Sequence, residues 1–117
     1  MRKVLIIMEQ DCLRDALQKE LQQEFEVSVC GNAEDGATLL ENRSDILVID
    51  LFLPGTNGLT FLIENKPYLP SIVVVLSVLT SPGILRKLAD LGVTSVIRVP
   101  CTLDAITSVL KKPHIDK

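Results

Sequence analysis

The sequence contains few aromatic residues: they make up 3% of its 117 residues, and tryptophan is absent. Because 47% of the residues are hydrophobic, leucine, isoleucine, valine and alanine must build the core of a single domain. Basic residues are not in excess either, and the formal net charge of −3 gives no cationic surface for nucleic acid. No apolar run approaches the length that crosses a membrane. These absences argue against direct nucleic-acid binding and against a membrane protein.

Motifs for nucleotides, secretion and disulfides are missing as well. No glycine-rich phosphate loop follows the first apolar run, and GxxxxGK[ST] does not occur, which weakens the alternative of a small flavin or nucleotide binder. The first apolar run is stopped by Glu9 and is too short for a signal peptide. The cysteines are odd in number and lack CxxC spacing, which predicts reduced thiols and a cytoplasmic location.

Apolar runs typical of buried strands alternate along the chain with segments of helical period. The runs that predict strands are 4–7, 26–30, 46–50, 71–76 and 93–99. The segments in which apolar residues recur at helical spacing are 13–25, 33–42, 58–65, 81–91 and 102–110. Parallel strands need crossover helices, so this alternation predicts an α/β fold with helices on both faces of a parallel sheet. We expect one domain over 1–112, and a tail or the start of a linker over 113–117.

The stretch 46–58 carries the main functional signal. Four apolar residues end on Asp50 and are followed by a proline and two glycines, which predicts a buried strand that delivers one acid to the rim of the sheet. In open parallel sheets, ligands bind beyond the carboxyl ends of the strands. Glu9 and Ser77 fall at the ends of other predicted strands on the same edge. We therefore expect the chemistry of the protein at this edge.

Asp50 and the Leu-Phe-Leu-Pro-Gly-Thr-Asn-Gly that follows it resemble the phosphoacceptor loop of response regulator receiver domains. The resemblance covers nearly the whole chain, including the acidic end of the first strand, residues 76–77 after the fourth and residues 92–101 around the fifth. It implies that residues 1–112 are a receiver domain with a flavodoxin-like, doubly wound sheet of five parallel strands, in the order 2-1-3-4-5, and five helices. It also implies a cis peptide bond before Pro100.

The same resemblance implies a phosphoacceptor signalling domain of a two-component system. Asp50 would accept a phosphoryl group with the help of Mg²⁺, which Glu9, Asp50 and the backbone carbonyl of Phe52 would hold. Ser77 would contact the phosphoryl group and act as the switch hydroxyl. Such a domain is not an enzyme beyond self-phosphorylation and autodephosphorylation.

Three residues depart from the family pattern around this site. Met8 stands where the family usually has a second acid, and its thioether offers Mg²⁺ nothing. Val99 replaces the lysine that contacts the phosphoryl group, a bond worth about 1.5 to 3 kcal/mol, and Val96 replaces the switching aromatic residue. Arg98 is adjacent, but side chains alternate along a strand, so we expect it to point away. These departures leave open an alternative, an atypical pseudo-receiver that binds proteins without phosphorylation.

The partners of the chain follow from the resemblance alone. A receiver domain would take its phosphoryl group from a sensor histidine kinase or a phosphotransfer protein, and would then act on an output domain or a protein partner. Homodimerisation through the last helices is common in the family. However, Thr94 and Ser95 stand where many members carry acidic residues, which argues against a salt-bridged homodimer.

Overall fold

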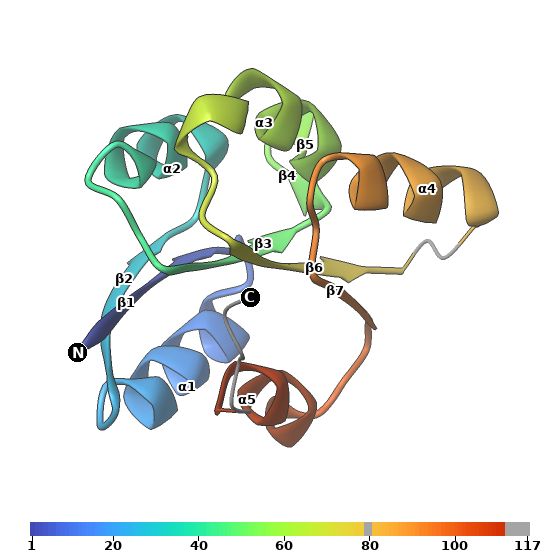
Figure 1. The fold of residues 1–117 in the computed structure, drawn as a ribbon. Coiled ribbons are helices and arrows are strands. Elements are labelled where there is room, and N and C mark those ends of the chain that lie inside the picture. The colour runs from blue at the N-terminus through green and yellow to red at the C-terminus, as the bar shows by residue number, and fades with distance from the viewer. Residues whose placement is uncertain (79–80, 112–117) are drawn as a thin grey trace.

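The computed structural model describes residues 1–78 and 81–111, and its centre is a sheet of five parallel strands (Figure 1). These strands are β1 (Arg2–Ile7), β2 (Phe25–Cys30), β3 (Ile46–Asp50), β6 (Ile72–Ser77) and β7 (Ser95–Arg98). They lie in the order β2-β1-β3-β6-β7, and each pairs with its neighbour in parallel. Counted along the chain this is the order 2-1-3-4-5, so the predicted flavodoxin-like sheet is confirmed.

Helices cover both faces of this sheet (Figure 1). One face carries α1 (Asp11–Leu21) and α5 (Leu103–Lys111). The other face carries α2 (Ala33–Leu40), α3 (Gly58–Glu64) and α4 (Pro82–Asp90). The connection from β3 to α3 contains a small antiparallel hairpin of β4 (Phe52–Leu53) and β5 (Thr56–Asn57), and a 3-10 turn, η1 (Lys66–Tyr68), follows α3. Every strand of the large sheet is thus followed by a helix, as the alternation predicts.

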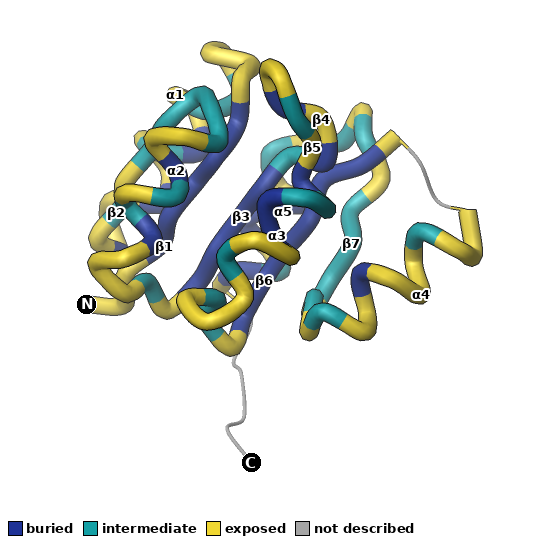
Figure 2. Tube along the Cα trace, turned by 90° about the horizontal axis from the view of Figure 1, so that it is seen from above, coloured by how far each residue is buried: buried dark blue, intermediate teal, exposed yellow. Residues whose placement is uncertain are grey.

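The core has two layers, one on each face of the sheet. Alternate residues of β1 show this arrangement: Val4 and Ile6 belong to the layer under α1 and α5, whereas Leu5 and Ile7 belong to the layer under α2, α3 and α4. In Figure 2, β1, β3 and β6 are mostly buried, and the outer faces of the helices are exposed. Strands covered on both faces have no polar side, which explains the uninterrupted aliphatic runs in the sequence. The more polar β2 is an edge strand, as predicted.

Some local predictions differ from the structure. Phe25, which its spacing places in the first helix, opens β2 instead, because α1 ends at Leu21 and Phe25 pairs with Arg2. Ser81 stands at the N-cap position of α4, but its side chain makes no capping hydrogen bond to any described residue. The last strand is shorter than expected, because β7 ends before Val99.

Two backbone features flank β7, and the second of them confirms a prediction. Gly92 ends α4 with a φ of 88°, in the left-handed conformation that glycine adopts without strain. The peptide bond between Val99 and Pro100 is cis.

Two further expectations concern the ends and the environment of the chain. No helix within residues 1–78 and 81–111 is long and apolar enough to cross a membrane. The predicted domain end at residue 112 and the tail over 113–117 lie outside the described residues.

Candidate functional site

Asp50 is the half-buried last residue of β3, the central strand of the sheet. The four residues before it, 46–49, are fully buried between β1 and β6. Asp50 lies opposite Leu76 of β6, and the next amide, that of Leu51, donates to the Leu76 carbonyl at 2.9 Å. The sheet therefore fixes the main chain on both sides of Asp50, and the carboxylate stands at the carboxyl edge.

The loop after Asp50 folds back against it. Pro54 and Gly55 link β4 to β5, and Gly55 has a φ of 74°, which a type II turn requires at its third residue. Gly58, the first residue of α3, donates its N–H to the Leu51 carbonyl at 2.6 Å. A Cβ atom on Gly58 would lie 2.7 Å from the carbonyl oxygen of Asp50. Because that oxygen belongs to the sheet backbone, glycine is needed for this close approach.

Two carboxylates meet at this edge. Glu9 follows β1, the neighbour of β3, and its side chain is exposed. The pKa of Asp50 is raised from 3.8 to about 6, first by burial and then by the negative charge of Glu9. The structure thus brings Glu9 within electrostatic reach of Asp50. A carboxylate with this pKa is still mostly ionised at pH 7, but it binds a proton or a cation more readily than an ordinary aspartate.

Ser77 lies at the same edge, one residue beyond the partner of Asp50 in β6. It is the last residue of β6, although the sequence places the strand end at Leu76, and it is 1% exposed. Its carbonyl accepts the N–H of Val99 at 3.0 Å, which ties the end of β6 to the chain that leaves β7. The predicted switch hydroxyl is therefore a buried group next to the acceptor strand.

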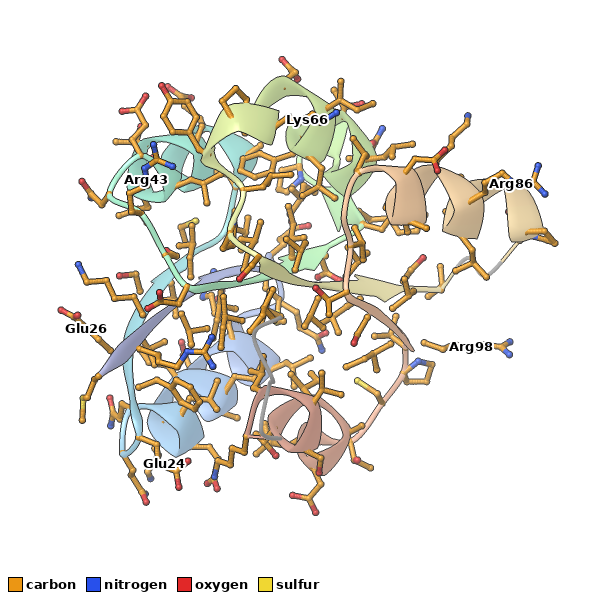
Figure 3. The ribbon with its side chains drawn as sticks, viewed as in Figure 1. Glu24, Glu26, Arg43, Lys66, Arg86 and Arg98 are labelled. Carbon is orange, nitrogen blue, oxygen red and sulfur yellow. The ribbon has the colours of Figure 1, made fainter. Side chains whose placement is uncertain are left out.

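The residues that depart from the family pattern take part in the hydrophobic core. Met8 is fully buried in the layer under α1 and α5. Val99 packs against the same layer, and Val96 packs against the opposite one. Arg98 is exposed and extends away from the sheet (Figure 3), which confirms the expectation from strand alternation. Met8, Val96 and Val99 thus pack in the core and offer no charged group to the site.

Sequence reasoning missed two neighbours of the acids. Burial, and after it the charge of Asp50, raises the pKa of the Cys101 thiol, which places Cys101 near Asp50. A thiol with a raised pKa stays protonated at neutral pH and is a poor nucleophile. The second neighbour is Arg14 of α1, whose guanidinium reaches the carbonyl of Met8. Neither contact leaves a signal in the sequence, because the first depends on where the chain after β7 comes to lie and the second on how a side chain of α1 folds back onto the preceding turn.

The oxygen atoms at this edge of the sheet suit a hard cation that needs few carboxylate ligands. Among the residues that the structure describes, no three His, Cys, Asp or Glu side chains come together as a metal-binding group. Mg²⁺ keeps several waters and is bound through one or two carboxylates with other oxygens. Glu9 and Asp50 fit this requirement, because a bound cation would offset both the burial and the charge of Glu9 that raise the Asp50 pKa. The Phe52 side chain has no oxygen atom, so its predicted contribution would come from the backbone carbonyl.

Solved structures with the same fold are receiver domains. The chain is similar to the non-phosphorylated HemR receiver domain from Leptospira biflexa, with a TM-score of 0.86 and 20% identity, over 98% of this chain and 100% of that one. It is also similar to a CheY-like response regulator receiver domain from Methanospirillum hungatei, with a TM-score of 0.85 and 18% identity, over 95% of this chain and 91% of that one. No protein-family model matches the chain.

In sequence, the chain is similar to a protein-glutamate methylesterase/protein-glutamine glutaminase from Hydrogenovibrio crunogenus. The two are 33% identical over 104 residues, which cover 84% of this chain and 28% of that protein. The chain spans about a quarter of the length of the curated relatives it matches, so the similarity concerns one part of them. The chain therefore has the fold of response regulator receiver domains, which confirms the fold that the sequence resemblance implies.

Proposed function

We propose that this chain is a phosphoacceptor of two-component signalling and that Asp50 accepts the phosphoryl group. The observation that supports this proposal best is the half-buried Asp50 carboxylate, fixed by the backbone at the carboxyl edge of the central strand beside Glu9. Its raised pKa of about 6 still leaves it mostly ionised at neutral pH, as a nucleophilic carboxylate must be.

The reaction is an in-line transfer from a phosphohistidine or from a small phosphodonor. One oxygen of the Asp50 carboxylate forms a bond to phosphorus, while the bond between phosphorus and the donor nitrogen or oxygen breaks. The leaving group takes the electron pair, and the product is an acyl phosphate on Asp50. No base is needed to deprotonate Asp50, because its carboxyl group is already ionised above its pKa of about 6.

Mg²⁺, when bound, would neutralise the negative charge that gathers between the phosphoryl group and the two acids. The residues that would hold it are Glu9 and Asp50, through their carboxylates, and Phe52, through its backbone carbonyl. The hydrogen bond from Gly58 to Leu51 keeps the loop that carries Phe52 folded against the acceptor.

Ser77 would transmit the modification to the surface. Its buried hydroxyl would donate a hydrogen bond to an oxygen of the phosphoryl group on Asp50. Its carbonyl is bonded to the N–H of Val99, so a shift of Ser77 would also move the chain after β7. Because Val96 replaces the aromatic residue of the family, this change would pass through the backbone and not through a ring rotation.

The partners that suit this function are a sensor histidine kinase or phosphotransfer protein upstream and an output domain or protein partner downstream. The matched relatives are named as methylesterases, so an enzymatic output of that kind is one candidate. The pseudo-receiver alternative rests on Met8, Val96 and Val99, and none of their described contacts favours it.

Phosphorylation by acetyl phosphate in the presence of Mg²⁺ tests this proposal. We expect intact-mass spectrometry to show one phosphoryl adduct on the native chain and none on Asp50→Asn. Asp15→Asn is the matched control, because it removes a carboxylate that is 71% exposed on α1, and it should carry the full adduct. A native chain without an adduct, or an undiminished adduct on Asp50→Asn, would contradict the proposal.

A further inference from the structure

We propose that Arg14 is a positioning residue that holds Glu9 in place for the phosphoacceptor site, an inference that rests on the function proposed above. Glu9 lies on the turn between β1 and α1, and we call the residues from Met8 to Asp11 the Glu9 turn. Arg14 lies on the first turns of α1, and its guanidinium folds back onto this turn.

Arg14 makes hydrogen bonds on both sides of Glu9. Its Nη1 donates to the Met8 carbonyl at 3.0 Å, and its backbone N–H donates to the Gln10 carbonyl at 3.1 Å. Its Nη2 donates to Oδ1 of Asp11 at 2.7 Å. The carbonyl oxygens of Met8 and Gln10, on either side of Glu9, therefore both accept hydrogen bonds from Arg14. A charge-assisted hydrogen bond from the same residue holds the side chain of Asp11.

The guanidinium is enclosed by the protein. The Arg14 side chain is 19% exposed, and Gly31, just after β2, leaves room for it, because a Cβ atom there would lie 2.7 Å from Nη1. Nε is buried without a hydrogen-bond partner in the described part of the chain, and the Asp15 carboxylate lies 4.0 Å away. Burying a cation with an unsatisfied donor is unfavourable, so the bonds to the Glu9 turn have to offset it.

The Glu9 turn lacks the other supports that a helix start often has. Gln10 occupies the N-cap position of α1, and its side chain makes no capping hydrogen bond within the residues described. The Met8 N–H donates to the Cys30 carbonyl at 3.0 Å, so the chain at the end of β2 holds the amide of Met8 and Arg14 holds its carbonyl. Glu9 itself is exposed, and its position depends on this main-chain frame.

Amide hydrogen exchange, measured without Mg²⁺, tests directly whether Arg14 holds the main chain of the Glu9 turn. In Arg14→Met, which keeps the methylene packing but removes the donors, we expect faster exchange at the amides of residues 8 and 14, with core amides such as that of Ile49 unchanged. Gly31→Ala should give the same pattern, because its methyl group displaces Nη1 without removing the arginine. Arg86→Met on α4, whose side chain extends outward in Figure 3, is the matched control and should leave these amides unchanged.

Magnesium binding tests the consequence for the site. We expect the Kd for Mg²⁺, measured by calorimetry, to rise about tenfold in Arg14→Met, as for other residues that orient a metal ligand. The phosphorylation rate at saturating Mg²⁺ should be retained, because Arg14 does not touch the reacting atoms. Arg14→Lys should restore part of the affinity, since one ammonium group can still reach a carbonyl oxygen.

The results separate this inference from the proposed function. Unchanged exchange at residues 8 and 14 in both Arg14→Met and Gly31→Ala would overturn the positioning role. So would a uniform rise in exchange that includes the core amides, because it would indicate a general loss of stability. If the native chain bound no Mg²⁺ and took no phosphoryl group, the proposed function would fail, whereas the exchange measurements would still decide the role of Arg14.

Discussion

The two acids of the site lie on turns that are held in different ways. The main chain fixes the Asp50 loop: the Leu51 N–H donates to β6, and Gly58 donates to the Leu51 carbonyl. The Glu9 turn depends on a side chain, that of Arg14, which spans it from α1. The difference teaches that Asp50 is secured by backbone geometry, which demands glycine at position 58, whereas the turn that carries Glu9 also needs the side chain of one nearby arginine.

The largest effect we expect concerns the charge of Asp50 itself. Its pKa of about 6 in the folded chain lies above the ordinary value of 3.8, so the folded state holds the proton more tightly than the unfolded state. Stability is therefore lost as pH rises from about 4 to about 6. Asp50→Asn removes this loss and should be more stable than the native chain at pH 8, by about 2 kcal/mol, because solvent screens part of the effect at a half-exposed carboxyl. Urea unfolding should show the difference vanish near pH 4, and a difference independent of pH would refute the explanation.

A second effect, of comparable size, is expected from crowding the Asp50 loop. Gly58→Ala would push a methyl group against the Asp50 carbonyl, and we expect a loss of about 1 to 3 kcal/mol in the free energy of unfolding. Gly83→Ala in α4 is the matched control, because its Cβ would meet no described atom within 4 Å. It should stabilise the chain by about 0.4 to 1 kcal/mol. Equal effects of the two substitutions would show that the Asp50 loop tolerates a side chain.

The smallest effect concerns the starts of the two helices that follow the acids. The Asn57 side chain accepts the Thr60 N–H at 2.8 Å and caps α3. Asn57→Ala should therefore lower stability by about 1 kcal/mol in chemical unfolding. Gln10→Ala at the start of α1 should change stability by less than about 0.5 kcal/mol, because no described cap is lost. A comparable loss of stability in Asn57→Ala and Gln10→Ala would contradict the claim that only the start of α3 has a side-chain cap.

The strands and the position of Asp50 were predictable, because a strand that is buried on both faces has an uninterrupted aliphatic sequence. Residues 46–49 and 72–76 are aliphatic without interruption, and an acid that ends such a run must emerge at the rim of the sheet. The pairing of Glu9 with Asp50 follows from the same rule, since β1 and β3 are parallel neighbours. Both predictions needed only the strand ends and the topology.

The features that sequence reasoning missed depend on tertiary contacts. Phe25 fits a helical period, but pairing with Arg2 draws it into β2. The Arg14 side chain reaches back from α1 to the Met8 carbonyl, and no capping motif in the sequence marks this contact. The proximity of Cys101 to Asp50 arises only when the chain after β7 reaches the central strand. Periodicity carries no information on such contacts.

The central claim is that two differently held turns bring Glu9 to a half-buried Asp50. Titration of the carboxyl carbons by NMR tests it most directly. The account predicts that Asp50 titrates with a pKa of about 6 in the native chain. In Glu9→Gln the pKa of Asp50 should fall but stay above its ordinary value, since burial is the larger cause. A native pKa near 3.8, or a raised pKa that Glu9→Gln leaves unchanged, would contradict the account.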